Sequence, residues 1–316
     1  MKVREMISAY TEYRKAIGEK FDTNATRLRN FMKFSGPEED VSIITDELCE
    51  QYLNKDATGN PRLRLDRHII LDGLFKWALA RGYINYNPLP ADRPQRPEGT
   101  PPYIYSTDEL KALFDNALTY QRGRSSLYPE TMRAVLQITY MLGLRIGETL
   151  NLKTSDIDLK NQTAIIKESK FYKSRVVPFN DQVCRLLIGY VEWKRQMGQD
   201  CSSESYLFLN KYGVRPSREI VEIHFSKIRR DAGITRTDGA AMMPRLHDLR
   251  HTFATHRLIA WYDAGMDVQK LLPSLSTYLG HTQLAHTSVY LSMTDRLLSL
   301  ANNRFESFYI GGKEDE

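Results

Sequence analysis

Most of the chain has the hydrophobic spacing of amphipathic helices, in which apolar residues recur every three or four positions. Before residue 98, four segments show this spacing: 6–17, 25–34, 44–53 and 66–82. The last segment ends in Gly82, and glycine is the residue best suited to the left-handed conformation that often terminates a helix. We therefore predict an N-terminal region of four or five short helices.

A proline-rich segment follows this helical region. Residues 87–102, NPLPADRPQRPEGTPP, contain six prolines in 16 positions. Proline removes a backbone donor and fixes φ, so the segment can sustain neither a helix nor a central strand and indicates an extended linker. We place the domain boundary near residue 98 and predict one domain over 1–98 and another over 99–316.

The region after the linker opens with a helix signal. Ser106 and Glu109 have the spacing of a capping box, in which each side chain bonds the backbone N–H of the other residue. Helical spacing then continues over 108–118 and 128–144.

A short β-hairpin is predicted next, because two β-like segments at 163–169 and 174–179 flank a turn-like KFYK. Helical spacing returns beyond it and continues to about Phe308. The expected fold class is therefore mainly α, with a helical N-terminal domain and a C-terminal domain that combines helices with a small antiparallel β-sheet.

Composition adds little to this picture. The 316 residues are 26% charged and 41% hydrophobic, which disfavours wholesale disorder, a collagen-like repeat and a coiled-coil rod. The net charge of +5 permits a polyanionic partner without requiring one.

The three cysteines lie far apart with no CxxC pair, so neither a disulfide framework nor a thiolate zinc site is encoded. The N-terminus lacks the apolar run of a signal peptide, and no segment approaches the roughly 18 to 20 apolar residues of a membrane span. We expect a cytoplasmic protein with no membrane partner.

Basic residues gather in two helical segments of the N-terminal domain. A solvated helix face is the commoner reason for such clusters, and residues 1–98 hold 16 basic against 15 acidic side chains. Any DNA-facing surface must therefore be a local concentration of charge. The candidate DNA-binding residues are Arg27, Arg29, Lys33, Arg62, Arg64 and Arg67.

Histidines are unevenly distributed, since five of the seven fall within 40 residues: His247, His251, His256, His281 and His286. The spacing of the first two would suit zinc ligands on a helix. However, the residues between them are Asp-Leu-Arg, which place a cation there and no glutamate after the first histidine. We expect no metal site, and we assign His251 and His256 to structural roles.

Five sequence motifs occur in a fixed order along the second domain: GLRIGETLNL at 143–152, SKFYKSRVVPF at 169–179, LHDLRHTFATH at 246–256, LGHT at 279–282, and Tyr290 nine residues after His281. This order resembles the tyrosine recombinase (phage integrase) family, and the resemblance covers essentially the whole chain. It implies a helical, SAM-like core-binding domain followed by a catalytic domain with the DNA breaking-rejoining fold.

The resemblance also implies a set of six catalytic residues: Arg145, Lys170, His247, Arg250, His281 and Tyr290. Glu148 supports the site in this interpretation, although Arg145 and Glu148 could also be a simple intrahelical ion pair. Lys173 and Arg175 are expected to contact phosphate. Lys173 is the alternative to Lys170 as the catalytic lysine.

The implied chemistry explains these residue types. The hydroxyl of Tyr290 attacks a scissile phosphodiester, forms a 3′-phosphotyrosyl bond and releases a 5′-hydroxyl. Guanidinium groups stay protonated and can clamp the phosphate oxygens, the role of Arg145 and Arg250. Lysine releases a proton more readily than arginine, so Lys170 is the expected general acid. His247 is the expected base that assists the tyrosine.

His281 is expected to donate a hydrogen bond to a phosphate oxygen. This chemistry needs no metal or nucleotide, and the sequence has no GxxxxGK[ST] loop for ATP and no convincing carboxylate cluster for magnesium. We therefore expect no cofactor.

The resemblance further implies double-stranded DNA as the partner, held by the two domains like a C-shaped clamp, and a homotetramer on synapsed DNA. Since the core-binding helices begin almost at residue 1, we expect the arm-binding domain of lambda-type integrases to be lacking and the DNA sites to be simple inverted-repeat core sites. An apolar helical face over 297–308 would dock into a neighbouring subunit, with intramolecular packing as the alternative. An accessory protein could set the direction of recombination.

One spacing departs from the commonest pattern of the family, because 30 residues separate Arg250 from His281. This interval is longer than in the Xer proteins and favours a mobile-element function. Two alternatives stay open: a type IB topoisomerase-like enzyme with the same tyrosine chemistry, and a non-catalytic DNA-binding regulator on the same scaffold.

Overall fold

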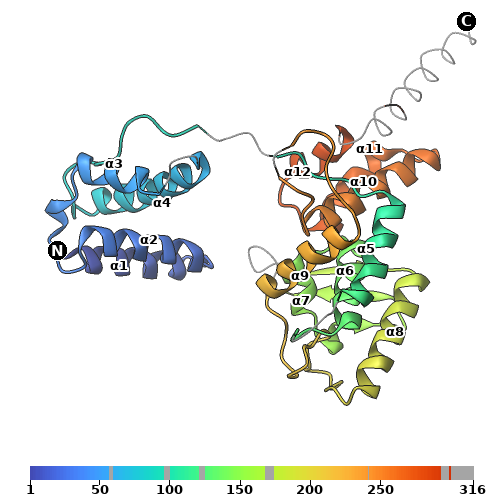
Figure 1. Ribbon diagram of the computed structural model, residues 1–316. Coiled ribbons are helices and arrows are strands. Elements are labelled where there is room, and N and C mark those ends of the chain that lie inside the picture. The colour runs from blue at the N-terminus through green and yellow to red at the C-terminus, as the bar shows by residue number, and fades with distance from the viewer. Residues whose placement is uncertain are drawn as a thin grey trace, which may run out of the picture. The chain divides into compact units, whose positions relative to one another are not determined.

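The computed structural model divides the chain into two compact units, Met1–Gly99 and Thr100–Glu316 (Figure 1). The structure describes residues 1–56, 60–95, 100–120, 125–167, 174–240, 242–292 and 299. In this part of the chain, no helix is long and apolar enough to cross a membrane.

The first unit confirms the predicted helices. They are α1 (Val3–Ala16), α2 (Asp22–Ser35), α3 (Asp46–Asn54) and α4 (Pro61–Ala80), with a 3₁₀ turn at Val41–Ile43. The ends of α4 follow from local sequence. The Asn60 side chain accepts a hydrogen bond from the backbone of Leu63 at 3.1 Å, and Gly82 ends the helix with a φ of 70°. The apolar faces of the helices enclose one core that includes the fully buried Phe31 and Phe75.

The second unit is also mainly helical, as predicted. Its helices are α5 (Thr107–Thr119), α6 (Pro129–Met141), α7 (Ile146–Asn151), α8 (Asp181–Gln196), α9 (Arg218–Asp231), α10 (Asp248–Asp263), α11 (Val268–Leu279) and α12 (Ala285–Ser288), with 3₁₀ turns at Thr154–Asp156 and Val289–Ser292. The predicted capping box of α5 is present. The backbone N–H of Ser106 donates to Glu109 Oε2 at 2.8 Å, and that of Glu109 donates to Ser106 Oγ at 3.1 Å.

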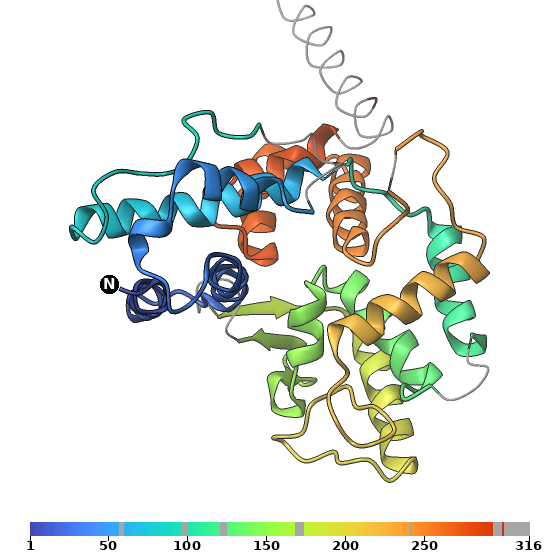
Figure 2. The ribbon, with the colours of Figure 1, turned by 60° about the vertical axis from the view of Figure 1, so that its left-hand side comes forward.

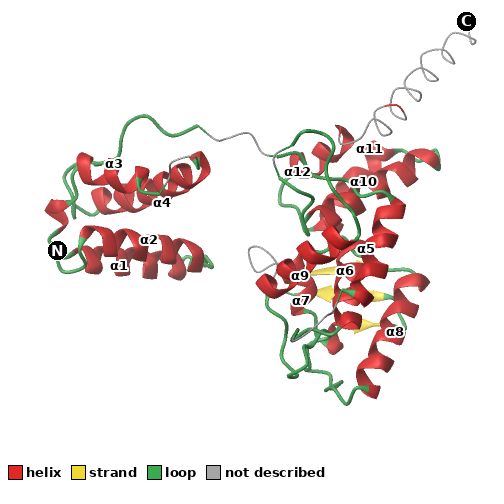
Figure 3. Ribbon diagram, in the orientation of Figure 1, coloured by secondary structure: helices red, strands yellow, loops and turns green. Residues whose placement is uncertain are grey.

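The predicted hairpin is confirmed as part of an antiparallel sheet in the order β1-β2-β3, with strands at Ile157–Asp158, Thr163–Ile166 and Arg175–Pro178. Strands β2 and β3 pair from Thr163 opposite Pro178 to Ile166 opposite Arg175, and they lie side by side in Figure 2. Figure 3 shows the short strands among the helices of this unit. Strand β1 was not predicted, because two residues are too few to show an alternating pattern.

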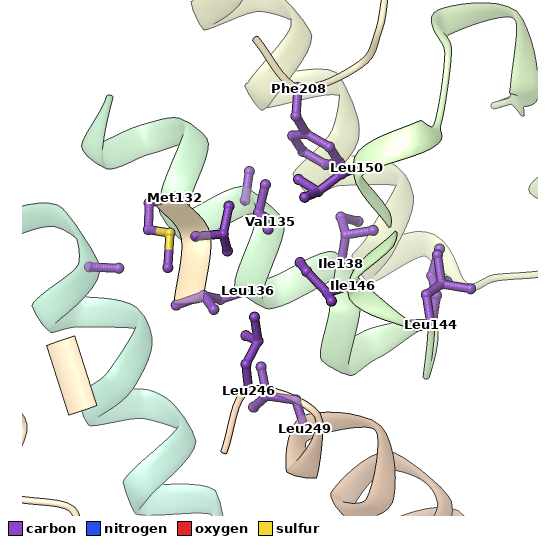
Figure 4. Packing of buried hydrophobic residues seen from close by; sticks show 14 of the residues in the cluster. Met132, Val135, Leu136, Ile138, Leu144, Ile146, Leu150, Phe208, Leu246 and Leu249 are labelled. Carbon is purple, nitrogen blue, oxygen red and sulfur yellow. The ribbon is translucent and has the colours of Figure 1, made fainter. Parts of the chain in front are cut away.

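A core at the junction of α6, α7 and α10 holds the second unit together (Figure 4). Its members include Val135 and Ile138 from α6, Leu150 from α7 and Leu249 from α10, and none of these side chains is more than 2% exposed. Each fully buried aliphatic side chain contributes roughly 1.5 to 3 kcal/mol to folding. The core therefore fixes the start of α7 relative to the start of α10, where the predicted arginines lie.

Candidate active site

A buried carboxylate lies at the centre of the candidate site. Glu148, in the first turn of α7, has a side chain only 7% exposed. Its oxygens accept hydrogen bonds from the backbone N–H of Arg145 at 3.0 Å, from Arg145 Nη1 at 2.8 Å, and from the two Nη atoms of Arg175 at 3.1 and 2.8 Å. Arg250 Nη1 lies 3.7 Å from Glu148 Oε2. One carboxylate thus faces three guanidinium groups, which come from the N-cap of α7, from β3 and from α10.

These cations keep Glu148 ionised. Burial alone would raise the pKa of the carboxyl group, but the hydrogen bonds and charge of Arg175, with the Arg145 backbone and the charge of Arg250, lower the pKa to about 2. The Arg145–Glu148 contact is therefore part of a larger buried network. An intrahelical pair alone does not describe it.

Arg250 is the most enclosed of the three arginines, with a side chain 1% exposed. Its Nη1 donates to the carbonyl of Gly143 at 2.9 Å, and its Nη2 donates to the carbonyl of Leu279. Burial and the charge of Arg145 lower the pKa of Arg250 to about 10, which still leaves the group protonated at neutral pH. Arg250 thus connects α10 to the turn before α7 and to the end of α11.

Arg145 is more accessible, with 31% of its side chain exposed. Besides Glu148, its guanidinium reaches the carbonyl of Gly280 at 3.4 Å. Gly280 has a φ of 67°, the left-handed conformation that terminates α11 and turns the chain toward His281. The glycine of the LGHT motif is therefore needed for the path of the backbone.

Tyr290 lies in the 3₁₀ turn after α12 and is 2% exposed. Its hydroxyl is 3.2 Å from His251 Nδ1. Burial raises the pKa of Tyr290, while the charge and hydrogen bond of Arg250 and the charge of Arg145 act in the opposite direction. The predicted nucleophile therefore lies beside both predicted phosphate-binding arginines.

The histidines of the site are held neutral. His281 lies with its ring stacked at 6.2 Å from that of Tyr290, and its Nδ1 is 2.8 Å from Thr287 Oγ1. Burial and the charges of Arg250 and Arg145 lower the pKa of His281 to about 3. At His247, the N-cap residue of α10, desolvation by the surrounding protein and the charges of Arg250 and Arg145 also lower the pKa of the imidazole.

The structure thus brings five of the six predicted catalytic residues to one place: Arg145, His247, Arg250, His281 and Tyr290. The predicted supporting residue Glu148 lies among them. Lys170 and Lys173 are outside the described residues, as is the segment 297–298 and 300–308 of the predicted apolar helical face.

Two side chains have different surroundings from those predicted. Arg175 was expected to contact phosphate, but its side chain is only 9% exposed. Its Nε donates to the carbonyl of Tyr278 at 2.7 Å while both Nη atoms bind Glu148. Arg175 therefore belongs to the buried network around Glu148, and its contact with phosphate stays a prediction. His251, which we assigned a structural role, contacts the hydroxyl of Tyr290. Its position next to Arg250 and one turn after His247 was the available sequence signal.

Three of the candidate DNA-binding residues of the first unit form ion pairs. Arg27 on α2 and Arg62 on α4 both bind Asp66, at 2.8 and 3.1 Å, so the two basic segments of the sequence are neighbours. Arg64 pairs with Glu50 at 2.9 Å. The remaining three candidates are Arg67, which donates to the backbone carbonyl of Tyr52, and the exposed Arg29 and Lys33.

Comparison with known proteins agrees with this geometry. Residues 105–296 match the profile of the phage integrase family. The putative integrase/recombinase y4rB of Sinorhizobium fredii is 32% identical over 308 residues, which cover 96% of each chain. Tyrosine recombinase XerC of Bacillus pumilus is 30% identical over 90% of this chain and 84% of its own length. A lambda integrase tetramer bound to a Holliday junction has a similar fold, with a TM-score of 0.67 at 17% identity over 94% of this chain and 78% of that one.

Proposed function

Because the chain belongs to the phage integrase family and is a tyrosine-type site-specific recombinase, we propose that it cleaves and rejoins DNA through a 3′-phosphotyrosyl bond to Tyr290. The observation that carries this proposal is the position of the Tyr290 hydroxyl beside Arg250, within the arginine network around Glu148. Among the described residues, Tyr290 is the one tyrosine that lies beside Arg250 and also has the predicted spacing from His281.

The proposed reaction conserves bond energy. The phenolic oxygen of Tyr290 forms a bond to the scissile phosphorus as the bond from phosphorus to the 5′-oxygen breaks, and the 5′-oxygen leaves with a proton. The 5′-hydroxyl of a partner strand then reverses the step on the phosphotyrosine. Because one phosphodiester replaces another, the reaction needs no ATP.

The arginines would stabilise the charge that develops on the phosphate. Arg145 is the one that can present free donor capacity, because nearly a third of its side chain is exposed. The Nη atoms of Arg250 are engaged by backbone carbonyls, so we assign Arg250 a fixed positive charge next to Tyr290 in addition to phosphate binding. Glu148 holds both arginines in place, and His281 would donate to a phosphate oxygen.

Lys170 is our proposed general acid for the departing 5′-oxygen, with Lys173 as the alternative; both lie between β2 and β3 in the sequence. If Lys170→Ala leaves cleavage intact while Lys173→Ala abolishes it, the assignment passes to Lys173.

We further propose that the chain acts on double-stranded DNA with inverted-repeat core sites, as a homotetramer that exchanges its C-terminal segment between subunits. The fold shared with the lambda integrase tetramer is compatible with such an assembly. Arg29 and Lys33, which are exposed, are the best placed of the predicted DNA contacts in the first unit. A mobile-element role, an accessory directionality protein and a cytoplasmic location stay predictions.

The decisive experiment is a covalent trapping assay. Purified protein is incubated with DNA from the flanks of its own gene, without metal or ATP, and the products are separated in SDS. We expect an SDS-resistant adduct whose modified peptide, identified by mass spectrometry, contains Tyr290. Tyr290→Phe should abolish the adduct, while Tyr278→Phe, a control in a partly buried tyrosine of the same unit, should retain it.

The two alternatives give different results. Specific DNA binding without any adduct would contradict the proposal and favour a non-catalytic regulator. An adduct with relaxation of supercoils, but no requirement for a second specific site, would favour a topoisomerase-like activity.

A further inference from the structure

Tyrosine is a poor nucleophile until its hydroxyl loses a proton, and burial of Tyr290 makes that loss harder. The groups around the hydroxyl differ in their ability to accept the proton. Arg250 is already protonated, and His281 stacks on the ring of Tyr290 with its Nδ1 engaged by Thr287. His251 directs its Nδ1 at the hydroxyl from 3.2 Å.

We propose that His251, and not His247, is the general base that holds the Tyr290 hydroxyl and accepts its proton during DNA cleavage. This inference rests on the proposed function. The expected base, His247, lies one helical turn before His251, and its ring meets that of His251 edge to face at 4.8 Å. The ring of His251 therefore contacts that of His247 and also lies 5.6 Å from that of Tyr290.

The charges around His251 suit this role. Burial, with the charges of Arg245 and Arg250, lowers the pKa of His251 to about 4, while Asp248 acts to raise it. The imidazole is therefore neutral at pH 7, with a lone pair on Nδ1 when the proton is on Nε2. A bound phosphate would bring negative charge toward the site and raise this pKa, since a nearby anion favours the imidazolium. The base would thus become stronger when the substrate is in place.

The proton balance of the step is complete. The proton of Tyr290 moves from Oη to His251 Nδ1 as Oη bonds to phosphorus, and the 5′-oxygen takes a separate proton from the general acid. In the reverse reaction, the histidine returns its proton to the tyrosine as the phosphotyrosyl bond breaks. Asp248, which is fully buried in the first turn of α10 and pairs with Arg245 at 2.8 Å, acts to raise the pKa of His251 and so favours the imidazolium.

The test compares single-turnover adduct formation by wild-type protein, His251→Phe and His251→Asn. Phenylalanine keeps a ring of similar size, and asparagine keeps a polar group that can hydrogen-bond the tyrosine, but neither accepts a proton. We expect both variants to form the Tyr290 adduct roughly 10² to 10⁴ times more slowly. Their rates should keep rising with pH where the wild-type rate has levelled off, since solvent hydroxide must replace the base.

A sulfur substrate separates a base from an acid. DNA with a bridging sulfur in place of the scissile 5′-oxygen has a leaving group that needs no proton. It should restore cleavage by a variant of the general acid, and it should not restore His251→Phe. The sulfur substrate thus separates loss of the base from loss of the acid, and the pH profile separates a base from a merely structural role.

The matched control is His256→Phe, because His256 lies on the same helix and its Nδ1 is 3.0 Å from another tyrosine hydroxyl, that of Tyr140. It should cleave DNA at close to the wild-type rate. If folded His251→Phe does the same with an unchanged pH profile, the inference is wrong; if that variant does not fold, His251→Asn decides. A wild-type protein that forms no adduct would instead overturn the proposed function itself.

Discussion

Glu148→Gln should lower the free energy of unfolding of the second unit by about 3 to 5 kcal/mol, because removing one partner of a buried ion pair leaves uncompensated charge in the interior. The substitution keeps the size of the side chain but removes its charge. The new amide N–H₂ would face the donors of Arg145 or Arg175, which now lie 2.8 to 3.1 Å from the carboxylate oxygens. Urea unfolding of the full chain, followed by tryptophan fluorescence, measures the change.

The pKa of Glu148 gives an independent magnitude. It lies at about 2 in the folded protein, against an ordinary value of 4.5, and one pKa unit corresponds to about 1.4 kcal/mol, so ionisation of this group contributes about 3 kcal/mol. Because the folded pKa is depressed, the contribution is complete above the unfolded pKa and is lost as the pH falls through the folded value. The stability difference between wild type and Glu148→Gln should therefore shrink between pH 4.5 and pH 2.

Glu222→Gln on α9 is the matched control. Glu222 binds Arg218 at 2.8 Å, the same distance as in the Glu148 pairs, but both of these side chains are exposed. Exposed pairs are worth about 0 to 1 kcal/mol, so the control should be nearly neutral. Equal losses in the two variants would refute the reasoning, since they would show that burial of the carboxylate among the arginines adds nothing.

Two further substitutions and one reagent test the surrounding structure. Gly143→Ala should lower the free energy of unfolding, measured by thermal unfolding, by about 2 to 4 kcal/mol. The reason is that Gly143 has a φ of 58° and an added Cβ would lie too close to the ring of Phe253. The control Gly147→Ala should be tolerated, because the space around Gly147 is open. Ser106→Ala should cost about 1 kcal/mol in urea unfolding, as it removes the cap of α5, and an unchanged midpoint would contradict this role. Cys49 should resist iodoacetamide at pH 8 until the protein unfolds, since burial raises the pKa of its thiol to about 12; mass spectrometry of the alkylated protein would detect any earlier reaction.

Local features of this protein could be predicted from sequence because they depend on residues close together along the chain. The four helices of the first unit follow from apolar spacing, and the start of α5 follows from the Ser106–Glu109 capping box, whose partners are three residues apart. The hairpin followed from two β-like segments around a turn. Strand β1 did not, because it consists of two residues that pair with β2 only after the chain has folded.

In the candidate site, too, some features could be predicted from the sequence and others could not. The order of the motifs singled out Arg145, Arg250 and Tyr290, since the chemistry requires those residue types and the spacing is a property of the chain. Nothing in the sequence indicated that Arg175 would bind Glu148, and the position of His251 next to Arg250 did not by itself show that this histidine would reach the hydroxyl of Tyr290.

These contacts join residues 27 and 39 positions apart. They exist because β3 and the chain that follows α11 pack against α7 and α10, so that side chains from four separate segments share one buried space. Burial there forces each polar group to find a partner, at a cost of about 1 to 3 kcal/mol for any left unpaired. The sequence thus determined which groups are available for the chemistry, and tertiary packing decided which of them contact one another.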